Sequence, residues 1–211
     1  ATQIQFIQNM FLAAATASLG ILGAQYWGKG DHQTVERILG LATKIVLLIS
    51  LLFFVVSFFF PEYIMHLFTN SPETIAEGVT YLRVLSFSFV FMGFAQIFVS
   101  ALRSVGKVVF PSVIYVVSLL VNVFLNATFI FGLFGAPKLG VVGVALGTVT
   151  ARAVEAVLCL IYSAGSKEIR FRVETMFQRS GVLFKDFLKI SAPSVINDLV
   201  WGLAASMFTV I

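Results

Sequence analysis

The sequence predicts an all-α protein, a polytopic bundle of about six transmembrane helices. Composition is the first observation behind this prediction. Of the 211 residues, 59% are hydrophobic and 11% are charged, and phenylalanine alone occurs 23 times. Soluble proteins contain roughly 45–50% apolar and about 25% charged residues, so a soluble globule could not cover this much apolar surface. Disorder is excluded as well, because it requires low hydrophobicity and high charge.

The second observation is the length of the apolar segments. A helix needs about 20 apolar residues to cross a bilayer core of roughly 30 Å. Six segments meet this requirement: residues 3–27, 41–60, 78–102, 108–134, 139–164 and 187–211. They are too long for barrel strands and do not alternate apolar with polar residues. Only helices or closed barrels satisfy every backbone group in lipid, so six helices are predicted.

Local features of the segments support helices in this order. Small residues line one side of segment 3–27 and allow close approach of another helix. Segment 41–60 ends at Pro61, and segment 139–164 contains a GxxxG step at Gly143 and Gly147.

The distribution of Lys and Arg predicts the orientation of these helices. Connector 28–44 carries three, connector 103–107 two and segment 165–189 six, against one in 61–77 and 135–138 together. Cytoplasmic loops carry the excess of Lys and Arg, so the first helix is expected to run from outside to inside. A chain that starts in this way, in an apolar stretch at Ala1, is expected to be an excerpt that lacks a preceding span.

Composition and motifs also bear on function. The formal net charge of +4 is concentrated in the connectors, which indicates topology rather than nucleic-acid binding. The single cysteine, Cys159, permits neither a disulfide nor a zinc site. The sequence has no GxSxG, Walker A or HExxH motif, so we expect no enzyme and no cofactor.

Asp198 is the first candidate for chemistry, because an ionisable residue inside a span is costly and functional by default. It lies eleven residues past Phe187, about 16 Å along the helix and near the midplane. We interpret it as a carboxylate that binds a cation or a proton. The alternative is a structural hydrogen bond to another helix.

Asn122 and Asn126 are four residues apart and share one helix face, which Ser118 extends by a turn. Thr148 on the next segment is expected at matching depth, about 15 Å from Lys138. Two amides and a hydroxyl provide oxygens for a hard cation such as Na⁺. They serve equally well as hydrogen-bonding groups between helices, and the spacing does not separate the two roles.

Arg152 and Glu155 are three residues apart and can pair. We expect them toward the cytoplasmic end of segment 139–164, as a structural ion pair rather than a transport site. Segment 165–186 is the longest polar stretch, and we interpret it as a cytoplasmic linker.

Several stretches together resemble the multidrug and toxic compound extrusion (MATE) family of antiporters. They are GAQYWGKGDHQTVERILG at 23–40, YLRVLSFSFVFMGFAQIFVSALRSVGK at 81–107, NVFLNATFIFG at 122–132, LGVVGVALGTVTAR at 139–152 and PSVINDLVW at 193–201. The family plan has twelve helices in two six-helix lobes, and this chain resembles helices two to seven. The resemblance implies that residues 1–164 form part of the amino-terminal lobe, 165–186 the linker between lobes and 187–211 the first helix of the carboxyl-terminal lobe.

The resemblance also implies export of amphipathic, often cationic, drugs in exchange for Na⁺ or H⁺ by alternating access. Asn122, Asn126 and Thr148 match positions of the family's amino-lobe cation site, but Asn126 replaces an Asp found in some members. Asp198 matches the acid of the family's Pro…Asn-Glu…Trp stretch, with Asp replacing Glu, and is therefore the stronger candidate for coupling. The implied partners are small organic cations and membrane lipid. A multi-pass, monomeric protein of the cell (inner) membrane is expected.

Two alternatives stay open. A lipid-linked oligosaccharide flippase of similar architecture would need more cationic groups at the midplane, because its cargo carries pyrophosphate. The other alternative is an integral membrane protein with no transport activity.

Overall fold

The computed structural model describes residues 2–66, 69, 71–135, 137–166 and 181–208. Within these ranges the chain is helical and contains no strand, which confirms the all-α prediction. The helices are α1 (Thr2–Gly28), α2 (His32–Phe59), α3 (Pro61–His66), α4 (Pro72–Ser104), α5 (Val109–Phe131), the 3₁₀ helix η1 (Leu133–Gly135), α6 (Gly140–Gly165) and α8 (Gly181–Phe208).

Five of these helices are long and apolar enough to cross a membrane: α1, α2, α4, α5 and α6. Each covers one of the first five predicted segments. The sixth segment, 187–211, falls on α8, which carries Lys185, Asp186, Lys189 and Asp198 and is not among the five. Residues 209–211 of that segment lie outside the described residues.

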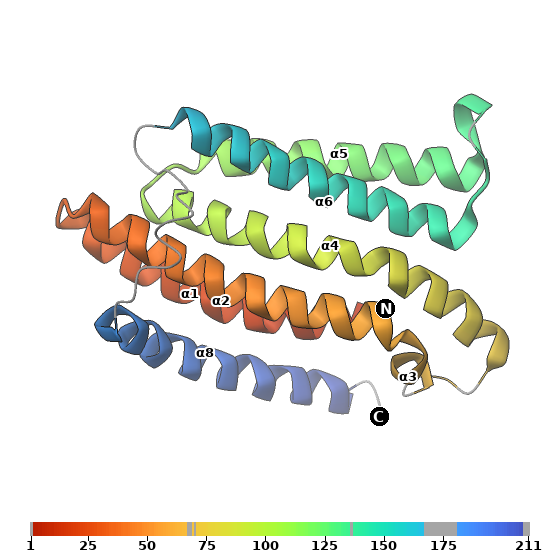
Figure 1. Cartoon of the computed structure of the whole chain (residues 1–211), viewed down its shortest axis with the longest axis horizontal. Helices are drawn as coiled ribbons and strands as arrows, with labels where there is room; N and C mark the ends of the chain where they lie inside the picture. The colour runs from red at the N-terminus through yellow and green to blue at the C-terminus, as the bar shows by residue number, and fades with distance from the viewer. Residues whose placement is uncertain (1, 67–68, 70, 136, 167–180, 209–211) are drawn as a thin grey trace.

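The long helices lie side by side with alternating directions, and α4 occupies the middle of the bundle (Figure 1). It packs against α1 and α2 on one side and against α6 on the other, while α5 packs on α6 and α8 packs on α1. The largest fully buried side chains include Phe98 of α4 and Phe187 of α8, which belong to one apolar core. As a result, α8 and the α5–α6 pair lie at opposite edges of the bundle (Figure 1).

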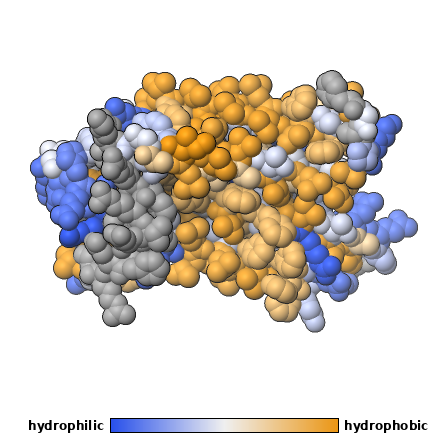
Figure 2. All heavy atoms as spheres, turned by 45° about the horizontal axis from the view of Figure 1, so that its top comes forward, coloured by the Kyte–Doolittle hydropathy of each residue, from blue (hydrophilic) through white to orange (hydrophobic). Residues whose placement is uncertain are grey.

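Large hydrophobic side chains also cover the outside. Val109, Leu120 and Phe131 of α5 are each more than 60% exposed, as is Leu52 of α2. Figure 2 shows a broad hydrophobic belt around one face of the molecule, with hydrophilic residues gathered toward its two ends. A soluble protein does not expose apolar surface on this scale. The outside is therefore suited to lipid, and the chain is a membrane protein with several spans.

Helix α2 begins nine residues earlier than predicted. The side chain of Asp31 accepts hydrogen bonds from the backbone N–H of Thr34 (3.0 Å) and from its hydroxyl (2.6 Å), which caps the helix at His32. The prediction of a connector over 28–44 was therefore wrong. Lys44 lies about 18 Å along α2 and is exposed, so its long side chain has to reach toward the nearer end of the helix.

Other boundaries also differ from the prediction. The connector over 61–77 contains α3 and the first turn of α4, and Pro61 begins α3 after α2 has ended at Phe59. Part of the predicted linker, 181–186, is the first turn of α8. Residues 167–180 of the linker lie outside the described residues. Helix α5 ends at Phe131 and is capped by Gly132, whose φ of 72° is a left-handed conformation that favours glycine.

Candidate functional site

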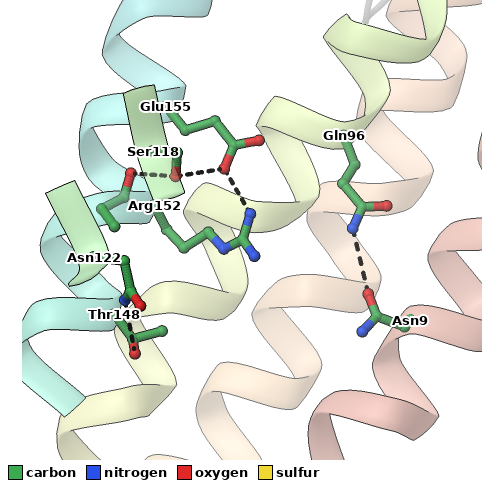
Figure 3. Close-up of polar contacts among 8 residues, drawn as sticks. Asn9, Gln96, Ser118, Asn122, Thr148, Arg152 and Glu155 are labelled. Atoms are coloured by element: carbon green, nitrogen blue, oxygen red, sulfur yellow. Dashed lines mark hydrogen bonds and ion pairs between the residues drawn. The ribbon is translucent and has the colours of Figure 1, made fainter. Parts of the chain in front are cut away.

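Polar side chains form a line between α5 and α6, which we call the polar seam. Its members are Ser118, Asn122 and Asn126 on α5 and Thr148, Arg152 and Glu155 on α6. Figure 3 shows all of them except Asn126. The two helices are antiparallel neighbours. Residues spaced one turn apart on α5 therefore face residues spaced one turn apart on α6. The structure therefore brings together every site residue that the sequence analysis named, except Asp198.

Amide groups occupy one half of the seam. The side-chain N–H of Asn126 donates to the amide oxygen of Asn122 at 3.1 Å, and the N–H of Asn122 donates to the Thr148 hydroxyl at 3.4 Å. Thr148 in turn donates to the backbone oxygen of Val144 at 3.0 Å. Among the described residues, the buried Oδ1 atom of Asn126 has no hydrogen-bond partner. The cluster thus presents one unsatisfied oxygen together with the amide oxygen of Asn122 and the hydroxyl of Thr148, which are three of the roughly six oxygens that a hard cation takes.

Glycine in α6 allows this close approach. A Cβ atom at Gly147 would collide with the side-chain oxygen of Asn126 and lie 3.4 Å from its backbone nitrogen. A Cβ atom at Gly143, one turn earlier, would lie 2.5 Å from the Cβ atom of Phe129. The predicted GxxxG step therefore packs α6 against α5, and Gly147 places Asn126 in the seam.

The charged half of the seam is an ion pair. The guanidinium of Arg152 donates to Glu155 Oε2 at 2.6 Å, and the Ser118 hydroxyl lies 3.5 Å from the same oxygen. The structure contains the predicted pairing, and the expected position toward the cytoplasmic end of the span stays a prediction. Arg152 is twelve residues from the start of α6 and thirteen from its end, about 18–20 Å from each. The pair therefore lies at mid-depth, where charges are costly.

Asp198 lies on α8, at the opposite edge of the bundle from the polar seam (Figure 1). Its side chain is partly buried and has no hydrogen-bond or ion-pair partner among the described residues. Pro193, one turn earlier, lacks the N–H that would bond to the backbone oxygen of Lys189. The carboxylate is thus neither tied to a basic residue of the described part nor joined to the seam.

Sequence analysis missed a second polar network in the core of α1, α2 and α4. The side-chain N–H of Gln8 donates to the Ser50 hydroxyl at 3.3 Å and to the backbone oxygen of Phe89 at 3.1 Å. Near it, Gln96 donates to Asn9 at 3.3 Å (Figure 3). The signal was present, because Gln8 and Asn9 interrupt the first apolar segment.

An apolar bundle of long helices with a polar seam between two of them defines a polytopic membrane protein. The sequence profile of the MatE family matches residues 1–128. This match covers more than half of the chain, so the chain belongs to the MatE family. The match confirms the resemblance seen in the motifs of the sequence.

Curated relatives agree with this assignment. The chain is 24% identical to the probable multidrug resistance protein YoeA of Bacillus subtilis, over 94% of this chain and 44% of YoeA. It is 28% identical to the probable multidrug resistance protein NorM of Rhizobium meliloti, over 100% of this chain and 44% of NorM. The chain thus spans less than half the length of these relatives. Both relatives are named for multidrug resistance.

Solved structures show the same fold. An inward-facing MATE family multidrug resistance transporter matches with a TM-score of 0.80 and 19% identity, over 93% of this chain and 44% of that chain. An outward-facing one matches with a TM-score of 0.76 and 18% identity, over 95% and 43%. The helices of this chain therefore follow part of the MATE architecture.

Proposed function

We propose that this chain is part of a secondary antiporter that exports amphipathic, often cationic, drugs in exchange for Na⁺ or H⁺. The observation that carries the proposal is a MatE-family bundle with polar and acidic side chains at mid-depth. Such groups are retained in a membrane when they bind a substrate or an ion. The names of YoeA and NorM, both probable multidrug resistance proteins, support drugs as the substrate class.

Asp198 is the residue that we propose for coupling. A partly buried carboxylate is stabilised by an opposite charge and destabilised without one, so a proton, Na⁺ or an organic cation would compete for it. Competition for one carboxylate is what couples the entry of the ion to the exit of the drug. Asn122, Asn126 and Thr148 provide neutral oxygens and no formal charge, so in this proposal they assist binding of a cation rather than drive exchange.

The transport step in this proposal is alternating access by rocking of two lobes. Residues 1–164 would belong to the amino-terminal lobe, 165–186 to the linker and 187–211 to the first helix of the carboxyl-terminal lobe. The protein would act as a monomer in the cell membrane. The flippase alternative is weaker, because Arg152, the cationic side chain of the seam, is already paired with Glu155.

Efflux of a fluorescent organic cation from cells tests the proposal. The complete protein is expressed in a strain that lacks its own pumps, and accumulation is compared with and without a sodium gradient and with a protonophore. Asp198→Asn is expected to abolish coupled export while the protein still inserts into the membrane. Asp186→Asn, the same change on the same helix near its start, is the matched control and should export normally.

Each outcome bears on a separate part of the proposal. Loss of export on removal of the sodium gradient identifies Na⁺, and loss with the protonophore identifies H⁺. Unchanged efflux by Asp198→Asn would remove Asp198 from the mechanism. Absence of export by the wild type would contradict the antiporter itself.

A further inference from the structure

We propose that Glu155 is a proton-binding site in the middle of the membrane, and that Arg152 is a counter-ion which Glu155 exchanges for the proton. The inference rests on the proposed function only in treating the chain as part of a cation-coupled transporter. It concerns a residue of the amino-terminal half, away from Asp198.

Glu155 is completely buried at the middle of α6. It lies about 15 Å from the nearer end of the helix, so water does not reach it along the helix axis. It is also the one acidic residue in the sequence of α5 and α6. A carboxylate in such a place has to be paired, fully hydrogen-bonded or neutral.

The pairing of Glu155 satisfies one of its two oxygens. Oε2 accepts from Arg152 at 2.6 Å and from the Ser118 hydroxyl at 3.5 Å, whereas the buried Oε1 has no partner among the described residues. Arg152 makes this contact through one nitrogen, not through the two parallel hydrogen bonds that give arginine–carboxylate pairs their strength. The ionised form of Glu155 is thus held from one side only.

Arg152 is able to leave this contact. Its side chain is 31% exposed, while that of Glu155 is 0% exposed. An exposed guanidinium at mid-depth is tolerated where it faces water or another polar group rather than lipid tails. Arginine keeps its proton in either position, so the charge that moves away from Glu155 stays on Arg152.

The surroundings of Glu155 favour a proton over a metal ion once Arg152 has moved. The titratable group one turn further along α6 is Cys159, a buried thiol. On the packed helices, α4 has no titratable residue between Arg83 and Arg103, and α5 has Tyr115 alone. No second cation is therefore available to balance the carboxylate, and hard cations need roughly six oxygens where Ser118 supplies one.

The chemical step is a simple exchange. A hydronium ion that reaches the pair from the exposed side of Arg152 gives up a proton, which forms an O–H bond with the Glu155 carboxylate. The carboxylate becomes a neutral acid, a water molecule is left behind, and no electron is transferred. The neutral acid no longer attracts the guanidinium, so Arg152 is released toward its exposed side. When the proton is lost, the carboxylate is charged again and attracts Arg152 back. The protonation of buried Glu155 is thereby linked to the position of the guanidinium charge at the exposed side of the seam.

Infrared spectroscopy of the purified complete protein tests this proposal without relying on transport. The absorption of protonated carboxyl groups shielded from water is followed as pH is lowered through the physiological range. We expect a band that is lost in Glu155→Gln and kept in Glu77→Gln, a control at an exposed glutamate. In Arg152→Gln the band should be stronger than in the wild type at the same pH, because the opposite charge that favours the ionised carboxylate is gone.

A permanent ion pair would give the opposite result. No band would then be lost in Glu155→Gln at any pH at which the wild type stays folded, and the proposal would be overturned. If Glu155→Gln fails to fold, the double variant Arg152→Gln/Glu155→Gln removes both charges together. Absence of the band from this variant supports the proposal, and its persistence overturns it. Failure of the wild type to export drugs would contradict the proposed function but leave this titration as it is.

Discussion

Two polar networks lie inside this bundle, and they differ in charge and in exposure. The core network joins Gln8, Ser50 and the backbone of Phe89, and all three residues are 0% exposed. The polar seam between α5 and α6 has partly exposed members, such as Asn122, and includes the charge of Glu155. The first network lies where three helices meet, and the second lies between two.

Each network leaves at least one buried oxygen without a partner among the described residues, but the chemistry of these oxygens differs. In the core network it is Oε1 of Gln8, an amide oxygen that does not take up a proton near neutral pH. In the seam they are Oδ1 of Asn126, again an amide oxygen, and Oε1 of Glu155, a carboxylate oxygen, which belongs to an ionisable group. The comparison teaches that buried polarity alone does not define an exchange site. A neutral network fixes helices, whereas a charged and partly exposed one can change its state.

The largest effect is expected from crowding the core network at Gly93. A Cβ atom there would collide with the Ser50 hydroxyl and lie 3.0 Å from a Val46 methyl group. Gly93→Leu should lower the free energy of unfolding by about 3 kcal/mol or more, measured as loss of folded protein on heating in detergent. Gly93→Ala should cost less and be partly rescued by Ser50→Ala. The control Gly28→Ala has nothing within 4 Å of its added Cβ and should be nearly neutral.

A smaller but more informative effect is expected at the seam. Gly147→Ala pushes a methyl group against the Asn126 amide, while Gly143→Ala pushes one against Phe129. Each should cost about 1–3 kcal/mol of stability, because the helices have to move apart. Gly147→Ala alone should also change the dependence of transport on the coupling ion. Equal transport profiles for the two variants would mean that the amide cluster serves packing only.

Replacing the buried amide of the core network should have little effect on either property. Gln8→Leu keeps the approximate volume and removes an unsatisfied oxygen together with the donor. Ser50 and the backbone oxygen of Phe89 then lose one hydrogen-bond partner each, and no charged group is left unpaired. We therefore expect the free energy of unfolding to change by about 1 kcal/mol or less and transport to be normal. The matched variant Asn122→Leu should impair transport. A transport defect in Gln8→Leu would contradict the distinction between the two networks.

Much of the fold could be predicted because lipid leaves an apolar chain few options. The five spans follow from unbroken apolar stretches, and the shared face of Asn122 and Asn126 follows from a four-residue spacing. The start of α2 could not be predicted from hydropathy, because its first turns are polar and depend on the Asp31 cap.

Contacts between helices far apart in the sequence were beyond prediction. Gln8 and Phe89 are 81 residues apart, and their hydrogen bond depends on how α1 and α4 rotate about their axes. Asp198 illustrates the same limit, since spacing along α8 gives its depth but not the neighbour it faces. The helix that carries Asp198 lies across the bundle from the helix that carries Asn126. The two residues are therefore two separate sites, whereas the sequence alone allowed them to be one.

The smallest effect is expected outside both networks, at the cap of α2, where pH acts on a fully exposed acid. Hydrogen bonds from the side chain and the backbone of Thr34 lower the pKa of Asp31 below its ordinary value of 3.8. Because the pKa is lower in the folded protein, the ionised cap contributes its full stabilisation at pH values above the ordinary pKa. This contribution is lost as the pH falls through the lower pKa of the folded protein. Asp31→Asn keeps a capping oxygen but removes the ionisable group. The melting temperature of this variant should therefore fall less than that of the wild type as the pH is lowered. Identical acid profiles for the two proteins would show that the charge of this cap contributes nothing, and the pH dependence of the bundle would then have to come from its interior.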